Sequence, residues 1–404
     1  MVEFEYRCTG CQRRYGRDQV RYLCPECGKG YKPGVPLPGV LEAVLDYAAL
    51  ARGLDRARPD LSRFCVVEER FHPALAVGNT PLAPAARLGA ELGLDRLWVK
   101  NDGLNPSGSL KDRASFLVVA EARRISERRI VTASTGNAAS ALAAVCASTD
   151  REALIFVPAS APRAKLVQMV LYGARVVPVR GTYDDAFRLS LEYSARRGGL
   201  SRNTAYHPLT IEGKKTVGLE IWRDLGLRTP DAVVVSAGDG VILAGVHKAF
   251  VDLVRCGFIE RLPRLICVQA ETSDAIHRYI ETGRYADAAH PTTRADSISV
   301  SCPSNARWAR RAVKESHGLS LLVSDAEILE AQRRLAASTG IFAEPAAAAA
   351  AAGLVKLQAG EQRLAPDQLV VLLVTGHGLK DVDAPLSRMD MPAPVDPVLE
   401  AVKD

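Results

Sequence analysis

Residues 105–113 read NPSGSLKDR and form a turn-rich loop that delivers one lysine to the start of an apolar segment. Asparagine-proline and serine-glycine are turn dipeptides, and serine can cap a helix. The segment that follows, residues 114–120 (ASFLVVA), is expected to continue as a helix. Lys111 is then held partly out of water, and burial favours the neutral amine that forms a Schiff base with a carbonyl group. The ordinary alternative is a surface lysine beside Asp112 and Arg113.

Apolar runs typical of buried strands alternate with helical patterns on both sides of this loop. The runs lie at residues 97–100, 130–133, 153–157, 174–179, 232–235, 265–268 and 370–374. Such alternation predicts an α/β fold with mostly parallel sheets covered by helices on both faces. The alanine run at residues 346–352 predicts a tightly packed helix, because alanine lets neighbouring elements approach closely.

The composition is that of an ordinary globular protein. The chain has 404 residues, of which 48% are hydrophobic and 24% charged, enough for two domains with a cleft between them. The net charge of +6 is spread out, so no nucleic-acid partner is expected. No apolar run reaches about 18 residues, and the first residues lack the apolar centre of a signal peptide. The expected protein is cytoplasmic and does not bind membranes.

Residues 1–33 form a separate unit with two CxxC pairs. The spacing of the four cysteines matches a four-thiolate zinc site with no open position, which makes the metal structural rather than catalytic. The predicted ligands are Cys8, Cys11, Cys24 and Cys27. Reduced thiols without metal, or two disulfides, are the alternatives, and a cytoplasmic setting disfavours disulfides. An amphipathic segment at residues 41–54 follows a Pro/Gly linker and is expected to wrap the main body.

Three stretches occur in the order found in a known family: residues 105–113, residues 133–137 (ASTGN) and residues 375–381 (TGHGLKD). They resemble the motifs of threonine synthases and their relatives among the fold-type II enzymes that use pyridoxal 5'-phosphate. The resemblance covers roughly residues 75–385. Some threonine synthases also carry an amino-terminal ribbon like the one expected here.

The resemblance implies two doubly wound parallel-sheet domains with the cofactor in the cleft between them, and a homodimer. The expected large domain spans residues 34–101 and 206–390, the small domain residues 102–205, and a loosely ordered tail residues 391–404.

The resemblance also assigns roles to the first two motifs. Lys111 attaches the cofactor and then moves protons at the substrate's carbon atoms as general acid and base. The loop of Ser134, Thr135, Gly136 and Asn137 follows a predicted strand and opens a predicted helix, whose free N–H groups favour an anion. It is expected to hold the substrate carboxylate, with Asn137 also contacting the ring hydroxyl of the cofactor. A plain helix cap is the alternative for these four residues.

A second strand-to-helix turn is expected to hold the cofactor phosphate through Gly238, Asp239, Gly240, Val241 and Ile242. The family usually has asparagine at position 239. A carboxylate facing a phosphate repels it, so Asp239 is expected to point away, to bond backbone amides or to be protonated. A dinucleotide-binding motif is disfavoured because position 243 is not glycine.

Thr375 aligns with the family's hydroxyl partner of the pyridine nitrogen. A neutral hydroxyl leaves the ring a weaker electron sink, which suits expulsion of a good leaving group. His377 and Lys380 belong to the same motif and are not assigned a substrate contact.

Position 210 departs from the family. Threonine synthases that resemble this segment have arginine there, suited to the phosphate of O-phosphohomoserine, and Thr210 cannot supply the charge. Lys165, Lys214 and Lys215 are candidate replacements, although each is interpreted more readily as a solvated surface lysine.

The resemblance therefore predicts a pyridoxal-phosphate-dependent lyase or synthase. It eliminates phosphate, or a similar leaving group, from an amino acid such as O-phosphohomoserine and adds a nucleophile. The alternatives are β-replacement on O-phosphoserine or another serine derivative, as in cysteate synthases, and deamination of serine or threonine. A hypothesis of another class is a zinc-ribbon binding protein with an inactive enzyme body.

Overall fold

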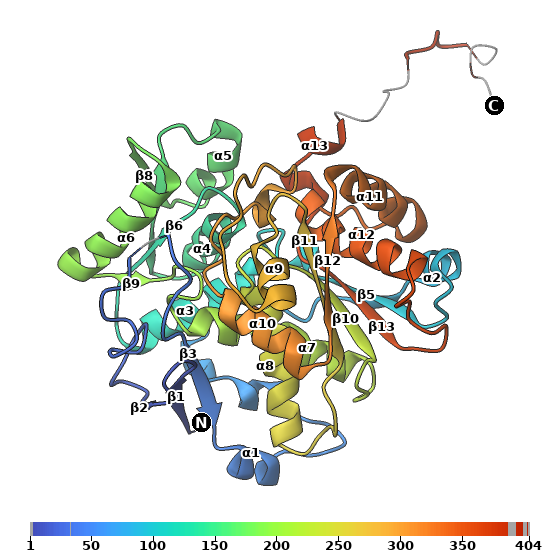
Figure 1. The fold of residues 1–404 in the computed structure, drawn as a ribbon. Helices are drawn as coiled ribbons and strands as arrows, with labels where there is room; N and C mark the ends of the chain where they lie inside the picture. Colours follow the sequence, from blue (N-terminus) through green and yellow to red (C-terminus); the bar gives the residue numbers. More distant parts are fainter. Residues whose placement is uncertain (1–2, 33, 387–392, 399–401, 403–404) are drawn as a thin grey trace.

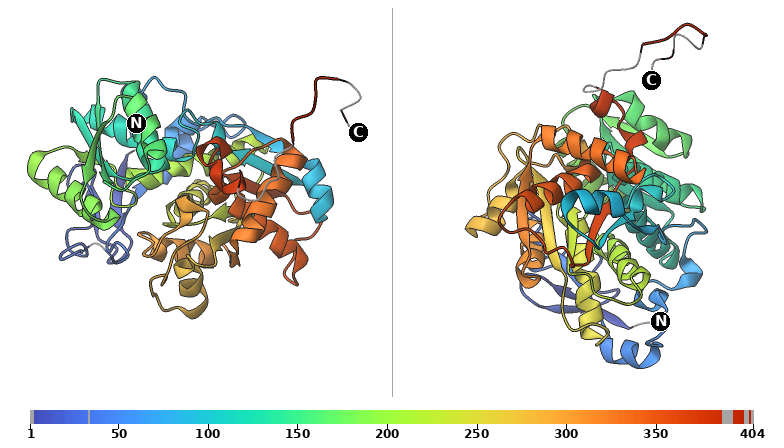
Figure 2. Two further views of the ribbon diagram at one scale, coloured as in Figure 1. Left: turned by 90° about the horizontal axis from the view of Figure 1, so that it is seen from above. Right: turned by 90° about the vertical axis from the view of Figure 1, so that its right-hand side faces the viewer.

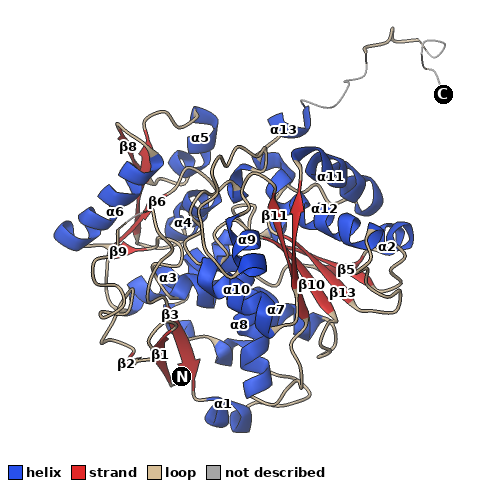
Figure 3. Ribbon diagram, in the orientation of Figure 1, coloured by secondary structure: helices blue, strands red, loops and turns tan. Residues whose placement is uncertain are grey.

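The computed structural model describes residues 3–32, 34–386, 393–398 and 402. Within them the chain forms three sheets, two of which belong to neighbouring α/β units (Figures 1 and 2). Residues of both units line a cleft. The third sheet lies at the amino terminus (Figure 3). None of the helices in this described part is both long and apolar enough to cross a membrane.

The larger unit is built on a six-stranded sheet. Its order is β12 (Leu319–Val323), β11 (Arg264–Ala270), β10 (Ala232–Ser236), β13 (Val370–Val374), β5 (Leu97–Asn101) and β4 (Leu82–Pro84). All neighbouring strands are parallel except β4, which is antiparallel to β5. The helices of this unit are α2 (Ala86–Leu92), α7 (Leu209–Asp224), α8 (Val241–Arg255), α9 (Ala275–Thr282), α10 (Ala306–Glu315), α11 (Asp325–Thr339) and α12 (Pro345–Ala359).

Alternate residues of the central strand β10 enter different hydrophobic cores. Val233 and Val235 pack in one core with side chains of α7 and α8, whereas Val234 packs in the other with α11 and α12. A strand buried on both faces reads as a continuous apolar run, which is why residues 232–235 are all valine or alanine. The larger unit is therefore doubly wound, as expected.

The smaller unit has a four-stranded parallel sheet in the order β8 (Arg175–Val179), β7 (Glu152–Pro158), β6 (Arg129–Ala133) and β9 (Leu200–Ser201). Its helices are α3 (Lys111–Arg124), α4 (Asn137–Ala147), α5 (Arg163–Leu171) and α6 (Tyr183–Arg197). Ile130 of β6 packs in a core with α3 and α4, whereas Val131 packs in a core with α6. This sheet is also covered on both faces.

The amino-terminal sheet is antiparallel, with β1 (Phe4–Cys8) between β2 (Arg14–Gly16) and β3 (Leu41–Leu45). The segment expected to be amphipathic, residues 41–54, forms β3 and then α1 (Tyr47–Gly53). The domain boundaries stay predictions, but the sheet of the amino-terminal module runs on past residue 33. Of the expected tail, residues 391–392, 399–401 and 403–404 lie outside the described residues.

The remaining elements are single turns. They are 3-10 helices at Leu61–Phe64, Glu69–Phe71, Asp102–Leu104, Asp296–Ile298 and Gly378–Lys380, and α13 (Asp383–Leu386). The seven apolar runs expected to be strands lie on strands, except that the run at residues 174–179 begins one residue before β8, and the alanine run lies inside α12.

Candidate active site

The loop before Lys111 is held by a dense set of hydrogen bonds. The carboxylate of Asp112 accepts hydrogen bonds from the backbone N–H of Ser107, at 2.7 Å, and from its hydroxyl. The carbonyl of Ser107 accepts from Lys380 Nζ at 2.7 Å and from Gln168 Nε2 at 3.1 Å. Lys111 is the first residue of α3, so these bonds fix where its side chain leaves the backbone.

Arg113 anchors the start of α3 to the larger unit. Its guanidinium donates to Asp102 at 2.6 Å and to Glu220 of α7 at 2.8 Å. Burial lowers the pKa of Arg113, but these two carboxylates outweigh burial and raise it. A surface lysine beside two solvated charges was the alternative for this loop, and it is wrong because Asp112 and Arg113 are both buried.

Lys111 lines a cavity at the carboxyl ends of β10 and β13, the edge at which open α/β sheets bind ligands. Burial lowers the pKa of its amine, the cation of Arg202 lowers it further, and Asp239 and Glu344 raise it. A lowered pKa favours the neutral amine, which is the form of lysine that acts as a nucleophile or base. The cavity is lined by Lys111, Asn137, Lys214, residues 236–242, Ser297, Ile298, Glu344, Ala346 and Thr375.

The glycine-containing loop at residues 236–242 joins β10 to α8 along one wall of this cavity. Gly240 caps α8 with φ +79°, a left-handed conformation that glycine adopts without strain. The first N–H groups of a helix have no intrahelical acceptor and attract anions. The carboxylate of Asp239 accepts hydrogen bonds from the Ser304 backbone N–H, at 3.2 Å, and from the Ser304 hydroxyl, at 3.1 Å. This bonding gives Asp239 a backbone partner, one of the arrangements considered for a carboxylate in this loop.

Thr375 follows directly after β13 and is buried on the cavity wall. Its carbonyl accepts from the N–H of Leu110 at 2.9 Å, which ties the end of the strand to the lysine loop. Thr375 and Lys111 therefore face the same cavity from two connected segments.

Asn137 and Glu344 meet where this cavity opens outward. Asn137 Nδ2 donates to both carboxylate oxygens of Glu344 at 2.9 Å, and lies 3.3 Å from the Ser297 hydroxyl. Burial raises the pKa of Glu344. The sequence interpretation missed Glu344, although its place directly before Pro345, the first residue of α12, marks it as a helix-start residue.

A wider outer cleft continues from the cavity, with which it shares Asn137, Ser297, Glu344 and Ala346. Of the loop expected to hold the substrate carboxylate, Thr135, Gly136 and Asn137 line this cleft. Ser134 lines neither space, and its hydroxyl accepts from the N–H of Gly136 at 3.2 Å.

His377 and Lys380 also line the outer cleft. His377 Nδ1 accepts from the N–H of Leu379 at 3.1 Å. Lys380 bonds to the smaller unit through the Gln168 side chain at 2.8 Å and the Ser140 hydroxyl at 3.2 Å. Lys380 thereby links the carboxyl-terminal segment of the larger unit to α4 and α5.

The largest difference between the expectation from the sequence and the structure lies in α7. Thr210 is buried, and its hydroxyl donates to the His207 carbonyl at 2.7 Å, so it serves the start of the helix. Lys214 and Lys215 were interpreted as solvated, which is wrong because both are buried. Lys165 does lie near the surface, 2.6 Å from Asp296.

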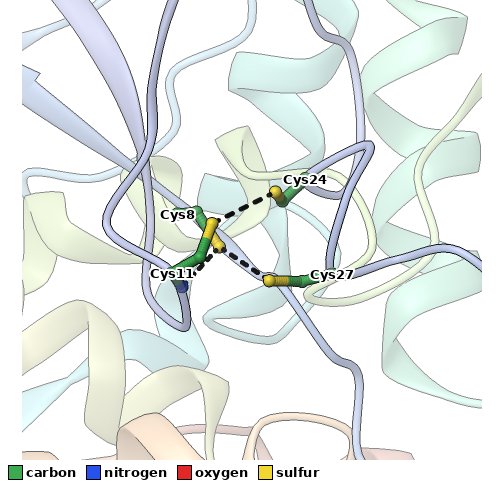
Figure 4. A group of neighbouring side chains, drawn as sticks. All are labelled: Cys8, Cys11, Cys24 and Cys27. Carbon is green, nitrogen blue, oxygen red and sulfur yellow. Dashed lines mark hydrogen bonds between the residues drawn. The ribbon is translucent and has the colours of Figure 1, made fainter.

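The four amino-terminal cysteines lie together, with all four Sγ atoms within 4.8 Å of one another (Figure 4). Cys8 and Cys27 are 3.7 Å apart at Sγ, as are Cys11 and Cys24. Tetrahedral zinc with Zn–S bonds of about 2.3 Å places its sulfur ligands about 3.8 Å apart, so the four thiols fit such an ion. The N–H groups of Gly10 and Cys11 point at the Cys8 sulfur, at 3.3 and 3.4 Å.

Residues 73–376, more than half of the chain, match the model of a family described as "Pyridoxal-phosphate dependent enzyme". The chain belongs to this family. It is 32% identical over 409 residues to a threonine synthase of Methanosarcina acetivorans, covering 99% of this chain and 98% of the relative. It is 33% identical to a threonine synthase of Methanocaldococcus jannaschii, covering 98% of both chains. The chain is thus a pyridoxal-phosphate-dependent lyase or synthase that resembles threonine synthases.

Solved structures of other enzymes have a similar fold. The processed form of threonine deaminase isoform 2 from Solanum lycopersicum matches with a TM-score of 0.65 and 23% identity, over 74% of this chain and 79% of its own. An L-serine ammonia-lyase from Rhizomucor miehei matches with a TM-score of 0.66 and 23% identity, over 77% and 98%. These likenesses confirm the expected fold class, whereas the roles of individual site residues stay predictions.

Proposed function

We propose that this enzyme removes phosphate, or a similar leaving group, from the side chain of an amino acid such as O-phosphohomoserine and adds a nucleophile. The observation that carries the proposal is that Lys111, the start of α8 and Thr375 line one cavity. The two relatives named threonine synthase, each aligned over nearly its whole length, support the choice of reaction.

The residues of the cavity fit pyridoxal phosphate. Lys111 offers an amine of lowered pKa for covalent attachment, and the loop at residues 238–242 offers helix N–H groups for the phosphate. Thr375 is the expected partner of the ring nitrogen and Asn137 that of the ring hydroxyl. When bound, the cofactor withdraws electrons from the substrate's α carbon, which makes the proton there removable.

The chain itself moves the protons and holds the substrate. In the reaction of O-phosphohomoserine, Lys111 takes the α proton and helps to remove a β proton, and phosphate leaves the γ carbon. Protons are then returned to the γ and α carbons, and water adds at the β carbon, which gives threonine and phosphate. The N–H groups at the start of α4 bind the substrate carboxylate from the outer cleft, next to Asn137. Glu344, whose pKa burial raises, holds a hydrogen bond with Asn137 and so fixes the amide beside the cavity.

A β-replacement on O-phosphoserine is the second candidate, and one observation favours it. Thr210 lines neither the cavity nor the outer cleft, so it does not replace the charge that threonine synthases have at this position. The second reaction uses a shorter phosphorylated substrate, with sulfite, a thiol or an amine as the nucleophile. Its phosphate group would therefore lie at a different place in the cavity. Deamination of serine or threonine shares the first steps.

Substrate assays separate these reactions. The protein is offered O-phosphohomoserine, O-phosphoserine with and without sulfite, serine and threonine, and released phosphate, 2-oxo acid and product amino acid are measured. Threonine formed from O-phosphohomoserine is the expected result. Phosphate released only from O-phosphoserine rejects threonine synthesis, and 2-oxo acid from serine or threonine alone identifies a deaminase.

Replacement of the lysine tests the enzyme class. Lys111→Ala is expected to lower the turnover rate by at least about 10⁴-fold, because it removes both the attachment point and the acid–base group. After borohydride reduction of the wild-type protein, mass spectrometry is expected to find the cofactor on the peptide that contains Lys111. Lys356→Ala is the control, since Lys356 is exposed on α12 and pairs with Glu327. An absent cofactor absorbance band, with no cofactor fixed at Lys111, supports the zinc-ribbon binding protein instead.

The proposal includes a structural zinc ion held by Cys8, Cys11, Cys24 and Cys27. The mutual distances of the four sulfur atoms support it. A homodimer, a cytoplasmic location and the lack of a nucleic-acid partner remain expectations from the sequence.

A further inference from the structure

Lys214 differs from every other fully buried lysine among the described residues. Its side chain is 0% exposed, and its Nζ has no hydrogen-bond partner in that part of the chain. The other three have carboxylate partners: Lys100 has Glu220 and Asp224, Lys215 has Glu212 and Asp252, and Lys248 has Asp252. Protein interiors rarely hold an unpaired amine, so the lack of a partner for Lys214 Nζ calls for a functional explanation.

The charges around Lys214 make an ammonium group there more costly still. Burial lowers its pKa well below the ordinary value, and the nearby cations of Lys111 and Arg202 lower it further. Asp239 acts in the opposite direction, but its carboxylate already accepts two hydrogen bonds from Ser304. These effects favour the neutral amine, whereas an added anion gives the amine a partner and favours its protonated form.

The position of Lys214 shows where such an anion can bind. The backbone of α8 approaches Lys214 at Gly245, where an added Cβ would lie 2.8 Å from the Lys214 Cβ. One turn earlier, Val241 begins α8, and the loop that ends there lines the same cavity as Lys214. The cavity therefore combines an unpartnered buried amine with the N-terminus of a fifteen-residue helix. Both groups favour a negatively charged ligand.

We infer that Lys214 is the cationic ligand of a phosphate group held at the start of α8. This inference rests on the proposed function, because that phosphate is carried either by the cofactor or by a phosphorylated substrate in the same cavity. Lys214 also supplies a positive charge to a loop that carries the carboxylate of Asp239. Lysine suits this position as a compact charge that a flexible stem can direct at one oxygen.

Cofactor binding by the apoprotein is the first test. Wild type and Lys214→Gln are titrated with pyridoxal phosphate and with pyridoxal, which lacks the phosphate. If Lys214 binds the cofactor phosphate, Lys214→Gln weakens binding of pyridoxal phosphate by about ten- to a hundredfold and leaves binding of pyridoxal unchanged within about twofold. Lys356→Gln removes the same charge from the surface and is expected to change neither affinity.

Steady-state kinetics identify a substrate phosphate. If the substrate carries the group, Lys214→Gln leaves the affinity for pyridoxal phosphate unchanged and raises KM for O-phosphoserine or O-phosphohomoserine by about tenfold or more. KM for serine then stays the same. Either pattern supports the inference, whereas equal effects on ligands with and without phosphate, or no effect on any of them, overturn it.

Thermal melting of the apoprotein supplies a readout that needs neither cofactor nor activity. Inorganic phosphate is expected to raise the Tm of the wild type and not that of Lys214→Met. Lys214→Met is also expected to melt at a higher temperature than the wild type without phosphate, because it removes an unpaired buried amine. An equal phosphate effect on both proteins rejects the inference. Failure of the wild type to attach cofactor at Lys111 instead rejects the proposed function, so the two failures can be told apart.

Discussion

Buried charges in the body of the protein, where α3, α7 and α8 pack together, differ from those that face the cavity. In the body, Arg113 lies between Asp102 and Glu220, and Lys215 lies between Glu212 and Asp252. Every one of these charges has a partner of opposite sign from the chain. The cavity is lined by two lysines, Lys111 and Lys214, without a carboxylate bonded to either amine among the described residues.

This contrast distinguishes paired charges that stabilise the fold from unpaired groups that are placed to bind a ligand. A buried pair is costly to break because the remaining charge has lost its solvent, so pairs within the body fix how α3 and α7 cross. Groups left without partners have shifted pKa values and are available for chemistry. The amino-terminal cysteines also belong to the ligand-binding group. Their four sulfur atoms lie within 4.8 Å of one another and are suited to bind a cation rather than an anion.

The largest expected loss of stability follows from breaking a pair in the body. Arg113→Met leaves the buried Asp102 without its cation and Glu220 with Lys100 alone, and we expect the free energy of unfolding to fall by about 3–5 kcal/mol. Chemical denaturation of the apoprotein measures the change.

Arg333→Met is the matched control, because Arg333 pairs with Glu330 on the exposed face of α11. A surface pair contributes little, so a loss below about 1 kcal/mol is expected there. Similar losses in the two variants would contradict the claim that the buried network holds the fold.

Removing the proposed zinc ion is expected to have the next largest effect. Cys24→Ser takes away one of four ligands, and we expect it to abolish stoichiometric zinc in elemental analysis. At zinc concentrations a hundredfold above the dissociation constant, the lost stabilisation is about 2.7 kcal/mol. Cys302→Ser, which alters a lone half-buried thiol outside the cluster, is expected to keep its zinc. Equal zinc content in the two variants would show that the cysteine cluster does not bind the metal.

The parts of this arrangement that are local in sequence were predictable. The lysine loop, the turn at residues 236–242 and the strand before Thr375 each combine turn residues with an adjacent apolar run, so their order along the chain places them at strand ends. Parallel strands bring such ends to one edge, which is why one cavity holds all three.

Burial of charged residues on α7 could not be predicted in the same way. Its sequence, LTIEGKKTVGLEIWRD, looks like a helix with one solvated face. Gly213 and Gly218 instead let neighbouring helices pack closely against α7. A Cβ at position 213 would lie 2.2 Å from the Arg113 carbonyl oxygen of α3, and a Cβ at position 218 would lie 2.6 Å from the Ala249 Cβ of α8. The packing of α3, α7 and α8 thus buries Lys214 and Lys215. In the sequence of α7, Gly213 and Gly218 are the features that indicate this close packing.

The smallest expected effect tests a carboxylate at the cavity mouth. Burial raises the pKa of Glu344, so the folded protein binds its proton more tightly than the unfolded chain. Below the unfolded pKa of about 4.3 both states are protonated and the carboxyl costs nothing. As the pH rises from the unfolded pKa through the folded pKa, the wild type loses stability that Glu344→Gln keeps. Denaturation of both apoproteins between pH 4 and pH 8 is expected to show a gain for Glu344→Gln that grows with pH and then levels off. A gain that is constant over this range would mean that Glu344 ionises as it does in water, and that Asn137 and the nearby cations stabilise its charge fully.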